Sequence, residues 1–150
     1  LADIIAGKLN TLRLGNIDSL RDWGYAKDYV HGIWATLQHG TPGDYIFATG
    51  QQYNVRNFVE EAFHLCGYDI AWRGSGTNEV GFDKTSGRVL IEIDSSYYRP
   101  ADVDTLVGNF DKAKKKLNWQ PKTSFKELVY LMVESDLKNN NLDPKQYLKA

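Results

Sequence analysis

Two arginines and one aspartate have the types and settings that could bind phosphate and sugar groups. Arg21 lies in the stretch "RDWG", just before a helix-like pattern, and Arg99 lies in "YYRPADVD", with Asp102 three residues further on. A guanidinium is a planar fork of donors that suits phosphate oxygens, and its charge does not titrate away. A carboxylate accepts hydrogen bonds from sugar hydroxyls. The two arginines could therefore converge on a diphosphate, while a structural ion pair for each arginine is the open alternative.

Other motifs that carry chemistry are missing from the sequence. Gly74, Gly76 and Gly81 match neither G-x-G-x-x-G nor the P-loop spacing, and no helix is expected directly after them, so we expect a flexible loop there. G-x-S-x-G and H-E-x-x-H do not occur, and the three histidines have no metal-ligand spacing. The sequence alone therefore indicates no catalytic machinery and no metal site.

The composition is that of an ordinary globular protein. The 150 residues are 42% hydrophobic and 25% charged, with a net charge of -1. This balance gives no indication of nucleic-acid or membrane-surface binding, and no apolar run is long enough to span a bilayer. A lone Cys66 cannot form an internal disulfide, so we expect a reducing, cytoplasmic setting.

The elements that position these residues follow from periodicity and capping signals. Alternation predicts strands, helical spacing with a cap predicts helices, and glycine predicts their ends. Helices are expected at 1–9, 26–39, from 55 onward, at 110–117 and from 124 onward. Extended segments are expected at 10–18, 44–50 and 88–94. We expect Asn54 to cap the second long helix and Ser124 with Glu127 to form a capping box.

Each long helix is expected to bury one apolar face. The first buried face would comprise Tyr29, Val30, Ile33, Trp34 and Leu37. The second would comprise Phe58, Val59, Ala62, Phe63 and Cys66. The third would comprise Phe125, Leu128, Val129, Met132 and Val133. Lys114–Lys116 are expected to face solvent, and the polar tail 139–150 is expected to fray.

Alternating strands and helices indicate the α/β class. About three strands are expected, which is few for an independent α/β domain. The chain also begins with Leu1, inside an apparent helix, and its one methionine is Met132. We therefore expect this chain to be part of a longer one.

Five stretches carry a family resemblance: "LGNIDSLRDWGYAKDYV" (14–30), "YIFATGQQYNVRNFVEEAF" (45–63), "NEVGFDKTSGRVLIEID" (78–94), "YYRPADVD" (97–104) and "AKKKLNWQPKTSFKELV" (113–129). In this order they resemble the GDP-mannose 4,6-dehydratase family of the extended short-chain dehydrogenase/reductase superfamily. The resemblance covers nearly all of the chain up to about Lys138. It places residues 1–138 in the C-terminal nucleotide-sugar-binding region of such an enzyme, with residues 139–150 as a tail.

The resemblance implies that the catalytic half lies elsewhere. In this family an N-terminal Rossmann-type half binds NADP and carries the catalytic residues, and its motifs are absent from this chain. The family enzyme oxidises C4 of the hexose in GDP-mannose, eliminates water across C5 and C6, and returns the hydride to C6. The product is GDP-4-keto-6-deoxymannose, and the enzymes usually form homo-oligomers. We expect the chain alone to be inactive and to expose apolar surface meant for the missing half.

The resemblance also assigns the nucleotide end of the substrate. It implies that Arg21 and Arg99 contact the diphosphate, that Asp102 holds the ribose hydroxyls and that Leu14 packs near the guanine. It assigns no catalytic, cofactor-binding or metal-binding residue to this chain. The alternatives are a fragment of another nucleotide-sugar dehydratase or epimerase, or a non-catalytic nucleotide-sugar-binding module.

Overall fold

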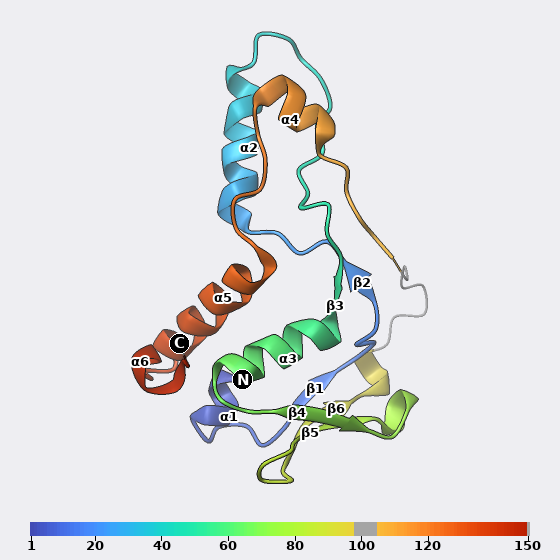
Figure 1. Ribbon diagram of the computed structural model, residues 1–150, viewed down its shortest axis with the longest axis vertical. Coiled ribbons are helices and arrows are strands. Elements are labelled where there is room, and N and C mark those ends of the chain that lie inside the picture. Colours follow the sequence, from blue (N-terminus) through green and yellow to red (C-terminus); the bar gives the residue numbers. More distant parts are fainter. Residues whose placement is uncertain (98–104, 150) are drawn as a thin grey trace.

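The computed structural model describes residues 1–97 and 105–149. Figure 1 shows an elongated molecule in which a small sheet with helices packed against it lies at one end and a pair of helices at the other. The helices are α1 (Ala2–Ile5), α2 (Ala26–Gln38), α3 (Val55–Leu65), α4 (Asp111–Leu117), α5 (Phe125–Asn139) and α6 (Pro144–Tyr147). The strands are β1 (Leu12–Leu14), β2 (Leu20–Arg21), β3 (Tyr53–Asn54), β4 (Ile70–Arg73), β5 (Val80–Asp83) and β6 (Val89–Ile93). Two single 3-10 turns lie at Gly76–Asn78 and Ser95–Tyr97.

The strands form two sheets. The larger sheet has the order β1-β6-β5-β4, in which β1 is parallel to β6 and the other neighbours are antiparallel. The smaller sheet is the antiparallel pair of β2 and β3. It lies between the larger sheet and the pair of helices α2 and α4 (Figure 1). The mixed α/β class predicted from the sequence is thus confirmed.

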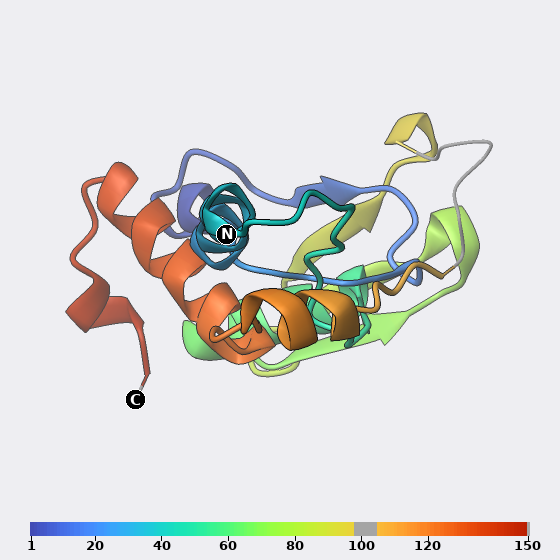
Figure 2. The same ribbon diagram turned by 90° about the horizontal axis from the view of Figure 1, so that it is seen from above.

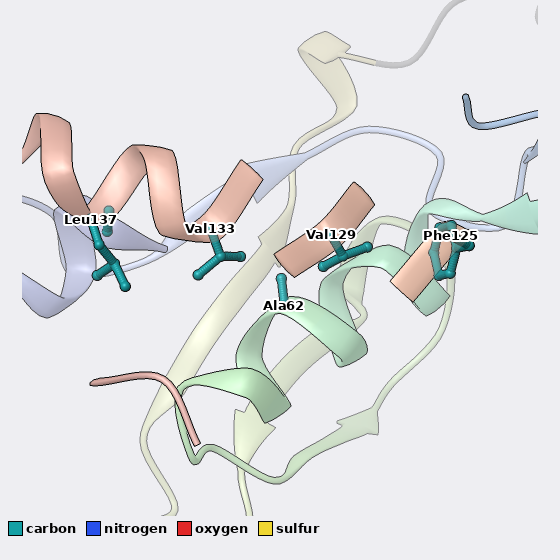
Figure 3. Packing of buried hydrophobic residues seen from close by; sticks show 6 residues of the cluster. Ala62, Phe125, Val129, Val133 and Leu137 are labelled. Carbon is teal, nitrogen blue, oxygen red and sulfur yellow. The ribbon is translucent and has the colours of Figure 1, made fainter. Parts of the chain in front are cut away.

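Helix α3 is the middle layer of the core. On one side Val59 and Phe63 of α3 pack with Leu90 and Ile91 of β6. On its other side Ala62 faces α5, from which it meets a row of buried side chains: Phe125, Val129, Val133 and Leu137 (Figure 3). The i, i+4 spacing of that row places all four side chains on one stripe of α5. Sheet, α3 and α5 therefore form three stacked layers.

Local capping chemistry sets where the two core helices begin. The Asn54 side chain accepts a hydrogen bond from Asn57 N, and the Asn57 side chain accepts one from Asn54 N. At α5, Ser124 and Glu127 exchange the same pair of bonds. These caps satisfy N–H groups that have no partner within the helix. Both predicted N-terminal caps are confirmed. Helix α3 ends at Leu65, and Gly67, two residues later, has a φ of +83° that suits glycine.

A second, smaller core joins α2 to α4. Trp119 is only 4% exposed, and its indole Nε1 donates to Asp28 O at 2.8 Å. Its ring meets Phe47 edge-on with centroids 4.7 Å apart. Gly32 is required in α2 at this point, because a Cβ there would lie 2.5 Å from Phe47 and 2.9 Å from the Trp119 ring nitrogen. The small core thus fixes which side of α2 faces inward.

The predicted burial of the apolar face of α2 is wrong for four of its five residues, whereas Tyr29 is half-buried, with its ring centroid 6.3 Å from that of Trp119. Val30, Ile33, Trp34 and Leu37 are 54–77% exposed, because α4 and Trp119 pack on the other side of the helix, at Gly32. The four exposed side chains share one face of the helix, at i, i+3, i+4 and i+7. These side chains form an exposed apolar face of α2, and its contact with a missing half is still a prediction.

The glycine-rich segment contains two strands instead of the expected flexible loop. Gly81 lies inside β5, where a Cβ would approach Ile91 Cδ1 to 2.8 Å and the Trp72 ring to 3.0 Å. Glycine here permits close packing between strands, and the register shifts between Gly81 and Phe82. Gly74, with φ of +88°, makes the turn out of β4. The expectation of only three strands is therefore wrong as well.

Three further expectations differ from the structure. Residues 44–50 have no ladder partner among the described residues, so the expected strand is absent there. Met132 is 45% exposed, whereas Leu137, which was not predicted, belongs to the buried stripe of α5. The tail folds back: α6 forms, Leu148 packs on the α3–α5 core, and Lys149 N donates to Leu65 O at 2.8 Å. Figure 2 shows α6 turning back beside α5.

Candidate functional site

A cavity of about 280 Å³ brings together Leu14 and Arg21, two of the four predicted site residues. It lies between the end of β1, the small β2–β3 sheet and the start of α3. It is lined by Leu14, Gly15, Asn16, Ser19, Arg21, Trp23, Val55 and Tyr97. Complete ligand sites usually enclose about 300–1,000 Å³, so this cavity has room for one end of a nucleotide sugar.

Among the described residues that line the cavity, Arg21 is the one cationic group, and it lies among apolar and aromatic walls. Leu14, Trp23, Val55 and Tyr97 supply flat or apolar surface of the kind that packs on a base. Arg21 is part-buried, and its Nη1 donates to Leu20 O at 2.7 Å. A part-buried guanidinium has few water molecules to displace when an anion arrives, which strengthens the interaction. The lining is thus chemically suited to a purine next to a phosphate.

The small sheet holds Arg21 in position. Leu20 and Arg21 pair with Asn54 and Tyr53 of β3, directly before α3 begins. The Trp23 indole Nε1 donates to Tyr53 O at 2.9 Å, which extends the connection by one more bond. A strand of two residues is weak by itself, so these flanking bonds determine where Arg21 lies.

Arg56, near the start of α3, holds the loop that follows β1. Its main-chain N–H donates to Ile17 O at 2.9 Å. Its guanidinium donates to Asp18 at 3.0 and 3.2 Å and to Glu79 at 2.7 and 3.2 Å, and it lies 4.5 Å from the ring centroid of Trp72. The hydrogen bonds to Glu79, and then those to Asp18, raise the pKa of Arg56 above its ordinary value despite partial burial. This guanidinium therefore has a structural role.

Arg99 and Asp102 lie outside the described residues, so the structure does not place them. The described chain resumes at Thr105, which forms a parallel bridge with Leu20. The Thr105 hydroxyl also accepts a hydrogen bond from Gln52 Nε2 at 2.6 Å. Position 105 is therefore next to the β2–β3 sheet that carries Arg21. The roles of Arg99 and Asp102 are still predictions.

A larger hollow of about 700 Å³ lies elsewhere, between α3 and the start of α5. Glu60, Glu61 and Asp69 line it together with Lys126. The Lys126 Nζ is already 3.6 Å from a Glu61 oxygen. Carboxylates in this number repel a diphosphate, so the smaller cavity at Arg21 is the better candidate for an anionic ligand.

The turn with Gly74 and Gly76 does not have the setting of a dinucleotide-binding loop. Gly74 and Gly76 lie between two antiparallel strands, β4 and β5, whereas a dinucleotide fingerprint lies between a strand and the N-terminus of a helix.

Within residues 1–97 and 105–149, no group of three His, Cys, Asp or Glu side chains could hold a metal ion. In the same ranges, no helix is long and apolar enough to cross a membrane.

Several residues of the cavity were missed in the sequence. Trp23 and Tyr97 are aromatic residues close to the predicted Arg21 and Arg99, and their proximity was the available signal. The need for Gly15 is visible only in the fold, where a Cβ at this position would lie 2.5 Å from Tyr97 O as β1 passes the 3-10 turn. No spacing rule predicted that Ser19, which is 4% exposed, would line this cavity.

Comparisons with known proteins agree on one family. The family described as GDP-mannose 4,6 dehydratase matches residues 1–132. The human GDP-mannose 4,6 dehydratase is 46% identical over 144 residues, which are 96% of this chain and 39% of the human protein. The chain thus spans about two fifths of the length of that relative.

Two solved structures share the fold. RMD from Pseudomonas aeruginosa, complexed with NADPH, aligns with a TM-score of 0.69 at 19% identity, over 92% of this chain and 40% of the other. The dTDP-glucose 4,6-dehydratase of Bacillus anthracis, in complex with NAD, aligns with a TM-score of 0.68 at 21% identity, over 95% of this chain and 39% of the other. The resemblance inferred from the sequence is thereby confirmed: the chain belongs to the GDP-mannose 4,6-dehydratase family.

Proposed function

We propose that this chain is the nucleotide-sugar-binding part of a GDP-mannose 4,6-dehydratase, with residues 1–138 as the binding region. The complete enzyme would convert GDP-mannose to GDP-4-keto-6-deoxymannose and water in the cytoplasm. NADP and the catalytic residues would be held by the part of the relatives that this chain does not span, and the chain alone would be inactive. The complete enzyme would form a homo-oligomer.

The observation that carries the proposal is the meeting of Leu14 and Arg21 in one cavity. In this proposal Arg21 contacts the diphosphate, and Leu14 packs near the guanine. Arg99 supplies a second cation for the phosphates, and Asp102 accepts hydrogen bonds from the ribose hydroxyls. A diphosphate has enough oxygens to engage two guanidinium forks at once.

The test needs the catalytic half, so it uses a hybrid enzyme in which this chain replaces the matching segment of the human relative. Arg21→Ala and Arg99→Ala should each weaken GDP-mannose binding by about 2 kcal/mol, or roughly thirtyfold, as for a lost charge-assisted bond. Arg13→Ala is the matched control, because the Arg13 side chain is 63% exposed and its ion pairs within the described part of the chain are long, at 3.6 Å to Glu92 and 3.9 Å to Asp94.

Isothermal titration with GDP-mannose, UDP-glucose and dTDP-glucose then separates the candidate functions. Preference for GDP-mannose together with dehydratase turnover supports the proposal. Preference for UDP-glucose or dTDP-glucose would instead indicate another nucleotide-sugar enzyme. Binding to the unmodified 150-residue chain as tight as to the hybrid, with no turnover in either, would favour a non-catalytic binding module. An unchanged dissociation constant for Arg21→Ala would remove Arg21 from the site.

A further inference from the structure

The carboxylate of Asp22 connects three separate segments of the chain. Its Oδ1 accepts hydrogen bonds from Thr49 N at 2.8 Å and from the Thr49 hydroxyl at 2.6 Å. Its Oδ2 accepts from Gly50 N at 2.9 Å and from Gly108 N at 3.2 Å. One side chain thus fixes the residue after β2, the end of the 44–50 segment and the chain before α4.

The two glycines allow the main chain to reach this carboxylate. Gly50 has a φ of +73°, a conformation that residues with a side chain rarely adopt. Gly108 passes so close to residue 48 that a Cβ would lie 2.3 Å from Ala48 Cβ. Both N–H groups can therefore point at Asp22 Oδ2 only because these positions lack side chains. The arrangement therefore depends on a carboxylate at position 22 and on glycine at positions 50 and 108.

Asp22 is covalently next to Arg21, the cation among the described residues that line the cavity. The β2 strand that carries Arg21 has only two residues and pairs with only two residues of β3. Such a short ladder fixes the main chain only in part, and the Trp23–Tyr53 bond and the bridge from Leu20 to Thr105 add to it. The bonds of Asp22 hold the chain immediately after Arg21 from outside the cavity, because Thr49 and Gly108 do not line it. Anchoring the main chain lowers the ordering cost when an anion binds.

We propose that Asp22 is a positioning residue, which holds Arg21 in the orientation that receives the diphosphate of the nucleotide sugar. This inference rests on the proposed function and deepens it. Asp22 itself does not touch the ligand; it acts through the main chain of Arg21. Its removal should therefore reduce the affinity for the phosphate end of the ligand more than the affinity for the base end.

The central variant is Asp22→Asn in the hybrid enzyme. Asparagine keeps the shape, but its amide nitrogen is a donor and cannot accept bonds from Gly50 N and Gly108 N. We expect the dissociation constant for GDP-mannose to rise about tenfold, with that for guanosine unchanged within about twofold. Because guanosine has no phosphate, it reports on the base end of the site alone. We expect KM to rise while kcat stays within about twofold of the unmodified hybrid.

Asp28→Asn is the matched control. Asp28 Oδ2 also accepts two main-chain bonds, from Lys122 N at 3.0 Å and from Thr123 N at 2.9 Å, and it joins α2 to the chain before α5. Asp28 does not line the Arg21 cavity. The same chemical change there should lower the melting temperature but leave the affinity for GDP-mannose unchanged. A general loss of stability is thereby distinguished from a loss of positioning.

A pair of variants at Thr49 tests the same connection from its other end. Thr49→Val removes the hydroxyl donor at 2.6 Å from Asp22, whereas Thr49→Ser retains a hydroxyl. We expect weaker GDP-mannose binding for Thr49→Val and recovery for Thr49→Ser. Valine keeps the branched shape of threonine but lacks the hydroxyl, whereas serine keeps the hydroxyl but lacks the methyl group. Recovery by serine would therefore show that the bond to Asp22 matters.

The outcomes separate this inference from the proposed function. If the unmodified hybrid does not bind GDP-mannose, the proposed function fails. If it binds and Asp22→Asn binds equally well, the positioning role of Asp22 is refuted and the proposed function stands. Equal losses for GDP-mannose and guanosine, or equal losses in Asp22→Asn and Asp28→Asn, would also refute the positioning role. A loss that requires the diphosphate and occurs only in Asp22→Asn supports it.

Discussion

Replacing Arg56 with methionine should destabilise the chain through one specific partner. The change keeps much of the aliphatic stem but removes the guanidinium that serves both Glu79 and Asp18. These two carboxylates differ in exposure: the Glu79 side chain is 14% exposed and that of Asp18 is 63% exposed. After the substitution Asp18 can be hydrated, whereas Glu79 is left as a largely buried charge without its cation.

The expected magnitude follows from that difference. The exposed pair with Asp18 is worth about 0.5 kcal/mol. Removing one partner of a fully buried pair costs about 3–5 kcal/mol, and the partial exposure of Arg56 and Glu79 reduces this to about 2 kcal/mol. Loss of the contact with the Trp72 ring adds about 0.5 kcal/mol. We therefore expect Arg56→Met to lower the free energy of unfolding by about 3 kcal/mol.

Urea titration of the 150-residue chain, followed by tryptophan fluorescence, measures this loss by linear extrapolation. Arg13→Met is the control, because its exposed ion pairs predict a change below about 0.5 kcal/mol. A double-mutant cycle of Arg56→Met with Glu79→Gln should give a coupling energy of about 1–2 kcal/mol, and the cycle with Asp18→Asn less than about 0.5 kcal/mol. A loss below about 1 kcal/mol for Arg56→Met, or a stronger coupling to Asp18 than to Glu79, would refute the reasoning.

Three further predictions concern the core, the exposed helix face and pH. Leu137→Ala should lower the free energy of unfolding by about 3 kcal/mol, because the side chain is fully buried, whereas Met132→Ala should change it by less than about 0.5 kcal/mol; urea titration compares the two. The exposed apolar face of α2 should promote self-association of the chain, so Trp34→Lys should weaken self-association in sedimentation velocity without changing the melting temperature. An unchanged association constant would contradict this expectation. Hydrogen bonds from Ser86 hold the pKa of Asp83 below its ordinary 3.8, although burial acts in the opposite direction. The ionised carboxylate therefore contributes its full stabilisation above about pH 4, and this stabilisation is lost as the pH falls through the lower pKa of the folded state. Asp83→Asn should flatten the acid side of a plot of melting temperature against pH, and an unchanged slope would contradict this assignment.

The sequence predicted the helices best where capping chemistry is local. Asn54 and the Ser124–Glu127 pair determine helix starts through bonds that span three residues, so their signal is visible in a short window. Strand β4 was missed because it ends directly before Gly74, and β5 was missed because its Gly81 is read as a breaker in sequence. Its actual role depends on Ile91 and Trp72, which come close only in the folded sheet.

The apolar face of α2 shows a second limit of sequence patterns. The spacing of Val30, Ile33, Trp34 and Leu37 correctly predicted a helix with an apolar stripe. It could not predict what covers that stripe, because periodicity says nothing about the partner. In this chain the small core around Trp119 uses the opposite side of the helix, where Gly32 makes room for it.

The candidate site was predictable in part. The chemistry of arginine indicated Arg21, and the family resemblance added Leu14; the structure places both in one cavity. The connection through Asp22 was not predictable, because three of its four donors are main-chain N–H groups, which every residue except proline possesses. Only the fold shows which of them point at the same carboxylate.

The parallel pairing of β1 with β6 has a consequence for how the chain folds. Leu12 pairs with Ile91, so this contact closes a loop that includes α2, α3, β4 and β5. Closing such a long loop costs chain entropy before any contact compensates for it. Contacts among α3, β4, β5 and β6 close shorter loops, because these elements are neighbours in sequence. We therefore expect the α3–β6 segment to form the folding nucleus, with β1 joining late. Substitutions in β1 should then speed unfolding and leave the folding rate nearly unchanged. The loop from Leu14 to Ser19, and with it the wall of the Arg21 cavity, would be among the last parts of the molecule to become ordered.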